Sequence, residues 1–252
     1  MPVMGTIEFR NIHKSFGDLV VLRGVDLKVD PGEIFFVIGQ SGAGKSVLVK
    51  HLIGLLRPDK GRIFLDGQDV TDLKEKEFYP IRKRCAMVFQ NSTLFDSMTL
   101  RENVALPIRK HLGVTEDEAM DMADEELKKV GMKRYGDRFP ADFGDGMRKK
   151  VAIARALTLD PEFVIFDEPT TGIDPISAAM VDDLIEHLSD KLGVTSIVIS
   201  HDLRSIFGIA DRIAMLYQGK LILDGTQEEF QNSDNPIVQQ FIQGLPDGPM
   251  EV

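Results

Sequence analysis

Short apolar segments separated by polar residues open the chain, at positions 7–9, 20–22, 25–29 and 34–38. We predict that each forms a β-strand and that the last, which is apolar throughout, is buried. This last segment ends at Gly39 and leads through a glycine-rich stretch into apolar positions with helical spacing. The pattern therefore predicts a strand, loop and helix unit.

Helical spacing dominates between about residues 91 and 157. Apolar residues from Met120 to Val130 lie three, four and three positions apart, and Thr115 and Glu118 precede them as a capping-box pair. We therefore expect a helical subdomain inserted into a sheet domain.

Later segments return to strand patterns. Two apolar segments, 163–166 and 196–199, each follow a helical stretch, as buried strands of a parallel sheet do. Segments 212–216 and 220–223 flank a Gln-Gly turn and predict a closing hairpin. From about residue 232 the hydrophobic periodicity weakens, so we expect the tail to be peripheral to the core.

Composition and charge narrow the range of partners. The chain has 252 residues, 43% of them hydrophobic, and a formal net charge of −10. That charge argues against nucleic acid or anionic lipid headgroups as the main partner, because either would need a basic face. No signal-peptide pattern and no long apolar run are found, so we expect a soluble, intracellular protein that reaches a membrane through a protein partner. Cys85, the single cysteine, is expected to be a buried apolar residue.

The loop after the buried segment 34–38 carries a strong chemical signal. It fits the pattern of a glycine, four residues and Gly-Lys-Ser, in the strand-to-helix setting that a phosphate-binding P-loop requires. Backbone amides in such a loop point at phosphate oxygens, and the following helix adds its positive end. We expect Lys45 to reach the β and γ phosphates and Ser46 to bind Mg²⁺. The residues assigned to the phosphate site are Gly39, Gln40, Ser41, Gly42, Ala43, Gly44, Lys45 and Ser46.

Two adjacent carboxylates follow the segment 163–166. Asp167, at the predicted strand end, is suited to hold Mg²⁺ through water. Glu168 is suited to polarise a water for attack on the γ phosphate. The alternative, that this Asp-Glu-Pro sequence is only a strand end and turn, carries less weight once the P-loop is present.

Two further polar residues are expected at the same edge of the sheet. His201 comes just after the segment 196–199 and can contact the γ phosphate, although a lone histidine is often incidental. Gln90 follows the apolar segment 86–89, where it can sense Mg²⁺ and the attacking water. The expected cofactors are therefore ATP and Mg²⁺.

These features together predict an α/β fold with a P-loop NTPase core. Its mostly parallel sheet is expected to carry an N-terminal antiparallel β subdomain and an inserted helical subdomain. The expected boundaries are 1–90 for the β subdomain and the P-loop part of the core, 91–157 for the helical subdomain, 158–231 for the rest of the core and 232–252 for a C-terminal extension.

With these motifs in this order, the chain resembles the nucleotide-binding subunits of ABC transporters, from about Ile7 to at least Asp224. The resemblance implies ATP hydrolysis in a head-to-tail homodimer. It also implies that Phe16 stacks on adenine, although Phe16 could instead belong to the core. The remaining implied roles are the Walker A loop for 39–46, the Q-loop for Gln90, Walker B and the catalytic base for Asp167 and Glu168, a D-loop ending at Asp174, and the switch histidine for His201.

Three segments without catalytic roles, 90–104, 211–217 and 235–244, resemble one group within that family, the Mla-type ATPases. Members of that group power phospholipid transport between the membranes of double-membraned bacteria and related organelles, with a permease and an MCE-type substrate-binding protein. The resemblance implies phospholipid cargo and a peripheral position on the cytoplasmic face of the inner membrane. It also implies a tail after Asn232 that reaches the neighbouring subunit or a small regulatory protein. Alternatively, the apolar spacing of Ile237, Val238, Phe241 and Ile242 is simply that of a short terminal helix.

Apolar residues interrupt the polar loop beside Gln90, at Leu94, Phe95, Met98 and Leu100. An apolar patch in such a loop usually marks a partner site. We expect an integral membrane permease to dock near Leu94 and Phe95.

The signature segment departs from the family pattern. Where family members carry Leu-Ser-Gly-Gly ahead of a helix, this chain has Phe143, Gly144, Asp145 and Gly146. A lost hydroxyl contact to phosphate would cost about 1.5 to 3 kcal/mol, and a carboxylate facing the phosphate would repel it. Alternatively, Asp145 caps its own helix and points away from the nucleotide.

The sequence thus predicts an ATP-hydrolysing transporter subunit. Because of Gly144 and Asp145, a catalytically weak or regulatory subunit remains an alternative, as does an importer ATPase for another substrate. A single cassette with negative charge argues against the ABC proteins of translation and DNA repair. A small-molecule kinase would not need Gln90, the signature region and His201 together.

Overall fold

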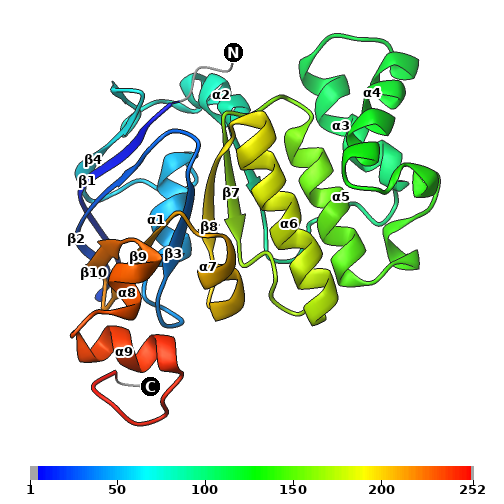
Figure 1. The fold of residues 1–252 in the computed structure, drawn as a ribbon. Coiled ribbons are helices and arrows are strands. Elements are labelled where there is room, and N and C mark those ends of the chain that lie inside the picture. The colour runs from blue at the N-terminus through cyan, green and yellow to red at the C-terminus, as the bar shows by residue number, and fades with distance from the viewer. Residues whose placement is uncertain (1–4, 251–252) are drawn as a thin grey trace.

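An antiparallel sheet forms one side of the computed structural model, which describes residues 5–250 (Figure 1). Its strand order is β2-β1-β4-β5, with β1 at Ile7–Phe16, β2 at Leu19–Val29, β4 at Lys60–Leu65 and β5 at Gln68–Asp69. The predicted segments 20–22 and 25–29 belong to the single strand β2. Gly24, at φ 82°, lies between them as the extra residue where the pairing with β1 changes register, so the strand continues through it. The expected antiparallel N-terminal sheet is therefore confirmed, with longer strands than predicted.

A mixed sheet, in the order β10-β9-β3-β8-β7-β6, forms the centre. Its neighbouring strands run parallel except for the hairpin of β9 and β10, which confirms the predicted fold class. The strands are β3 (Ile34–Ile38), β6 (Cys85–Val88), β7 (Phe163–Asp167), β8 (Thr195–Ile199), β9 (Arg212–Tyr217) and β10 (Lys220–Gly225).

The central strands β3, β7 and β8 are buried at every position, and their side chains alternate between two cores. Phe36, Phe166 and Val198 face the helical side. Phe35 and Ile197 face the antiparallel sheet and the helix that follows the P-loop. Because both faces are covered, these strands lack the polar alternation of a half-exposed sheet.

Helices cover both faces of the mixed sheet, and α3, α4 and α5 form a separate layer at one end (Figure 1). The capping box predicted for α4 is present, since the Glu118 amide donates to Thr115 Oγ1 at 3.3 Å and the Thr115 amide donates to Glu118 Oε2 at 2.8 Å. The helices are α1 (Lys45–Leu52), α2 (Glu75–Arg84), α3 (Leu100–His111), α4 (Glu116–Lys129), α5 (Asp145–Leu157), α6 (Pro175–Leu192), α7 (Leu203–Ile209), α8 (Gln227–Gln231) and α9 (Pro236–Gln243). No helix within residues 5–250 is long and apolar enough to cross a bilayer.

The C-terminal segment packs more closely than the sequence predicts. Val238 of α9 and Met250 are buried in the core cluster that includes the helical layer. The Met250 amide donates to Gln240 Oε1 at 2.7 Å, which folds the segment after α9 back onto that helix. The expectation of a wholly peripheral tail is therefore wrong for these residues. Cys85 is buried as predicted, and burial raises the pKa of its thiol to about 12.

The turn from β3 into the P-loop passes directly over β9. Gly39 has φ 138°, and a Cβ atom there would lie 2.1 Å from the carbonyl oxygen of Leu216. We expect Gly39→Ala to lower the free energy of unfolding by about 1–3 kcal/mol, through backbone strain and displacement of β9. Denaturant unfolding followed by circular dichroism measures this change.

Gly208, in α7, is the matched control, because it has open space around its Cβ position. Gly208→Ala should leave stability unchanged or raise it by up to about 1 kcal/mol. An unfolding curve for Gly39→Ala that superimposes on that of the wild type would show that this close approach does not constrain the loop.

Candidate functional site

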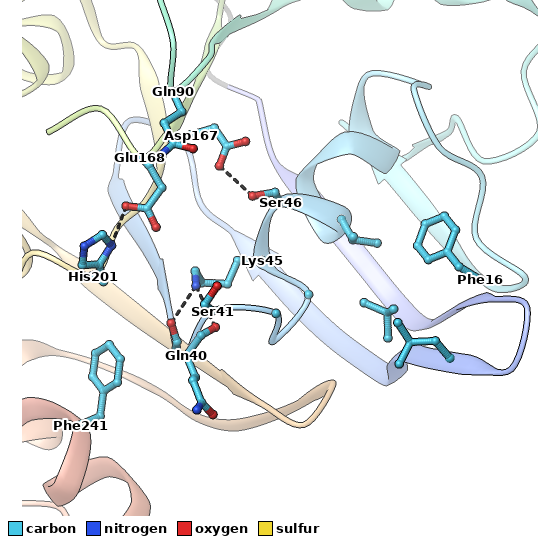
Figure 2. A pocket seen from close by; sticks show the side chains of 16 residues that line it. Phe16, Gln40, Ser41, Lys45, Ser46, Gln90, Asp167, Glu168, His201 and Phe241 are labelled. Atoms are coloured by element: carbon cyan, nitrogen blue, oxygen red, sulfur yellow. Dashed lines mark hydrogen bonds and ion pairs between the residues drawn. The ribbon is translucent and has the colours of Figure 1, made fainter. Parts of the chain in front are cut away.

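A cavity of about 760 Å³ lies where the strands of the mixed sheet end at their carboxyl sides (Figure 2). The structure brings the P-loop together there with the four strand-end residues that the sequence singles out: Gln90, Asp167, Glu168 and His201. The cavity is also lined by Phe16 and Phe241. In the P-loop, Ala43 is buried and does not line the cavity, whereas the other seven predicted positions do.

The P-loop presents a helix start and a folded-back lysine. Gly44, at φ 100°, is the N-cap of α1, and no side chain within the described residues caps this end. The first amides of α1 are therefore open to an anion. Lys45 Nζ donates to the carbonyls of Gly39 at 2.7 Å and Gln40 at 3.0 Å. Burial lowers the pKa of Lys45, while the Glu168 and Asp167 carboxylates act in the opposite direction.

Ser46 and Asp167 form the second part of the site. The Ser46 hydroxyl donates to Asp167 Oδ1 at 2.8 Å, across the gap between α1 and the end of β7 (Figure 2). With the side-chain amide of Gln90, which lines the same cavity, these groups offer hard oxygen donors. This donor set fits Mg²⁺, which binds few protein oxygens and completes its shell with water and substrate phosphates.

Glu168 has its carboxylate fixed from two sides. Its Oε2 accepts from Thr171 Oγ1 at 2.9 Å and lies 2.8 Å from His201 Nδ1. The backbone of Glu168 is left-handed at φ 55°, a conformation that costs of order 1–3 kcal/mol unless its surroundings hold it. Its amide donates to Ile199 of β8 at 2.9 Å, which supplies part of that support. The sequence named the segment containing Thr171 but gave no sign of this contact.

Phe16 lies at the opposite end of the cavity from Phe241 (Figure 2). Phe16 is 46% exposed, so the alternative that it belongs to the core is wrong. Lys14 Nζ lies 5.4 Å from the centroid of its ring. Phe241, which comes from α9, was missed because its spacing fits an ordinary terminal helix.

The signature residues do not line this cavity. Gly144 is the N-cap of α5, with φ −70°, and no side-chain hydrogen bond caps the helix within the described residues. Asp145 is the first helical residue, and its carboxylate pairs with Arg148 at 2.5 Å. The interpretation that Asp145 caps its own helix is therefore wrong. Gly146 packs closely against α6, where a Cβ atom would lie 2.6 Å from Ser177 Oγ.

Asp174, the other predicted nucleotide contact, also lies outside the cavity lining. Its carboxylate caps α6 by accepting from the amides of Ile176 and Ser177, both at 3.0 Å. Within one chain, Asp174 thus has a local structural role.

Lys149 is a buried residue of α5 whose position the sequence did not reveal. Its ammonium group donates to the backbone carbonyls of Gln90 and Glu168. The sequence could have indicated that Lys149 is buried, because it lies one turn before Ala152 and Ile153 on the apolar face of α5. A charged residue on an apolar face needs a buried partner.

Comparison with known proteins gives consistent results. A family model described as ABC transporter matches residues 22–171. The chain is 38% identical over 250 residues to a protein of Mycobacterium leprae named probable ribonucleotide transport ATP-binding protein mkl, covering 99% of this chain and 72% of that one. It is 39% identical over 244 residues to a Haemophilus influenzae protein named intermembrane phospholipid transport system ATP-binding protein MlaF, covering 97% and 92%.

A solved structure shows the same architecture. It is titled as the dimeric post-hydrolysis state of the ATP-binding cassette MJ0796 bound to ADP and Pi. It superposes with a TM-score of 0.80 at 29% identity, covering 87% of this chain and 98% of that one. On these matches, the chain belongs to the ABC transporter family, as one of its ATP-hydrolysing subunits.

Proposed function

We propose that ATP hydrolysis by this chain drives phospholipid transport between two membranes, together with an integral membrane permease and an MCE-type substrate-binding protein. The proposal that the cargo is phospholipid rests on the 39% identity, over 97% of this chain, to a protein named for intermembrane phospholipid transport. Transport of another substrate is the second candidate, because a relative 38% identical over 99% of this chain is named for ribonucleotide transport.

In the proposed site, ATP lies along the cavity between its two aromatic ends. Phe16 stacks on the adenine, and the P-loop amides and Lys45 hold the phosphates. Ser46, Asp167 and Gln90 would hold Mg²⁺, which would neutralise part of the phosphate charge when bound.

Hydrolysis is proposed to depend on Glu168 and His201. The Glu168 carboxylate, held by Thr171 and lining the cavity, accepts a proton from the water that attacks the γ phosphorus, while the bond to the β–γ bridging oxygen breaks and ADP leaves. The His201 imidazole, 2.8 Å from that carboxylate at its Nδ1, contacts the γ phosphate. Both groups act by position, which is the main protein contribution to phosphoryl transfer.

A second copy is proposed to complete each site. The superposed cassette MJ0796 is named as a dimer, and here Gly144, Asp145, Gly146 and Asp174 lie outside the cavity of their own chain. In a head-to-tail homodimer these residues would face the partner's phosphates. Arg148 pairs with Asp145 and offsets part of the carboxylate charge. The expected repulsion between Asp145 and the partner's phosphate is therefore smaller than for an unpaired carboxylate. If the repulsion between Asp145 and the phosphate prevents closure of the dimer, the chain is a catalytically weak subunit.

The permease is proposed to dock at the loop before α3. Phe95 is 50% exposed and Leu94 is half-buried, whereas Leu100 is fully buried and does not belong to the patch. The loop is held by Asn103, whose Oδ1 accepts from the Phe95 amide at 2.7 Å. Its Nδ2 donates to the Phe95 carbonyl at 3.0 Å. A fixed loop that presents an aromatic side chain is suited to receive a partner helix.

Such docking would place the chain peripherally on the cytoplasmic face of the inner membrane. The segment after α9 contacts its own chain through Met250 and Gln240, which favours a tail that is not exchanged between subunits. A small regulatory protein on this segment stays a prediction.

Glu168→Gln tests the proposed base. The amide keeps the shape but cannot accept the proton, so we expect kcat to fall by about 10²- to 10⁴-fold while ATP affinity changes less than about threefold. Phosphate release and equilibrium binding of a fluorescent ATP analogue measure the two quantities. Glu186→Gln, on an exposed position of α6, is the control. Retention of more than a tenth of the activity would exclude Glu168 as the base.

The double change Gly144→Ser with Asp145→Gly tests the signature segment. A restored hydroxyl contact of about 1.5–3 kcal/mol would raise turnover by roughly ten- to a hundredfold, if that contact forms in the transition state. Asp145→Asn removes the charge alone and separates the two contributions. An unchanged rate in both variants means that this segment does not limit turnover.

Phe95→Asp tests the docking surface. A buried carboxylate without a partner would prevent the permease from binding, so the tagged variant should lose the permease in purification from membranes. Its ATPase activity in isolation should stay within about twofold of the wild type. Leu112→Asp, at an exposed apolar position after α3, is the matched control and should retain the permease. Equal recovery of the permease with both variants would refute this site.

A further inference from the structure

A buried lysine lies next to the ends of β6 and β7, and its hydrogen-bond acceptors within residues 5–250 are all backbone carbonyls. Lys149 of α5 is 2% exposed. Its Nζ donates to the carbonyl of Gln90 in the shortest of its contacts, and also reaches the carbonyls of Glu168 at 3.4 Å and Phe89 at 3.5 Å. One ammonium group thus connects α5 to the ends of both β6 and β7.

This lysine is costly for stability. Within residues 5–250 no carboxylate pairs with it at ion-pair distance, and Asp145, Asp167 and Glu168 act on it only from farther away. Burial lowers the pKa of Lys149, because the charged form loses solvation. Burying an ammonium group costs free energy that hydrogen bonds to carbonyls offset only in part, so we expect an apolar side chain of similar length to be tolerated here. Packing therefore gives no reason for a lysine here.

The carbonyls that it holds belong to residues with a part in the site. Gln90 and Glu168 line the cavity from adjacent strands, and α5 begins at the signature segment, within two turns of Lys149. The contacts to the carbonyls of Gln90 and Glu168 fix the backbone from which these two cavity-lining side chains extend. A displacement of about 1 Å in a reacting group can cost on the order of a hundredfold in rate.

We propose that Lys149 is a positioning residue that locks the backbones of Gln90 and Glu168 to α5, so that movement of the helical layer shifts both groups together. This inference rests on the proposed roles of Gln90 and Glu168. Lys149 does not line the nucleotide cavity. It lines a neighbouring cavity of about 430 Å³, together with Gln90 and Asp145.

Lys149→Met in the full chain is the main test, with Lys149→Arg as the conservative variant. We expect kcat for Mg-ATP to fall at least tenfold in Lys149→Met, with the KM for ATP within threefold of the wild type and no loss of melting temperature. Lys149→Arg keeps donors for the carbonyls and should retain at least a third of the activity. Lys150→Met is the matched control, because Lys150 Nζ donates to the Met180 sulfur at 3.5 Å and has no hydrogen bond to the backbone of Gln90 or Glu168 among the described residues.

Amide hydrogen exchange gives a readout that does not depend on turnover. In Lys149→Met, exchange should rise together in segments 88–92 and 166–171, and it should not rise in Lys150→Met. A role in global stability would instead raise exchange throughout the sheet and lower the melting temperature.

The proposal is overturned if exchange in the two segments is unchanged in Lys149→Met, or if its kcat stays within twofold of an active wild type. A parallel loss of ATP affinity, melting temperature and kcat would also overturn it, in favour of a structural role. If the wild type itself shows no turnover, the proposed site roles fail, whereas the exchange result still decides whether Lys149 locks the two segments.

Discussion

The parallel register of the central strands is the constraint on which the site depends. Val88 of β6 pairs with Phe166 of β7, and Asp167 of β7 pairs with Ile199 of β8. The residues that follow these pairs, Gln90, Glu168 and His201, therefore leave the sheet at one edge, beside the loop after β3. Segments more than a hundred positions apart in sequence meet there because apolar strands fix the register. The cores on the two sides of the sheet thus determine the geometry of the cavity.

Charge at this edge is arranged around two buried lysines. Lys45 lines the cavity from the P-loop, and Lys149 donates to the backbone carbonyls of Gln90 and Glu168. Burial lowers the pKa of both, which reflects the cost of holding an ammonium group away from water. A bound phosphate chain would offset that cost for Lys45, whereas the hydrogen bonds that Lys149 makes within residues 5–250 all go to backbone carbonyls. Lys45 is thus suited to bind a ligand, and Lys149 is suited to hold backbone carbonyls in place.

Local patterns predicted the buried strands, the P-loop and the α4 capping box, because each depends on residues close in sequence. They failed where tertiary contacts decide the outcome. The bulge at Gly24 joins two predicted strands into β2, and Met250 packs onto α9 through a contact with Gln240. A local choice was also missed. Asp145 pairs with Arg148 instead of capping α5, and the spacing of the residues allows either contact. The helical spacing of α5 marks its buried face, but it does not show which carbonyls receive Lys149.

The most direct measurement is a structure of the full chain bound to Mg-ADP and a γ-phosphate analogue. The account predicts adenine on Phe16 and the analogue between Lys45 and the carboxylate of Glu168. It also predicts a second copy whose Gly144 to Gly146 segment closes the phosphate end. Nucleotide bound away from the P-loop would contradict the proposed site. A fully enclosed phosphate within a single copy would contradict the need for a partner.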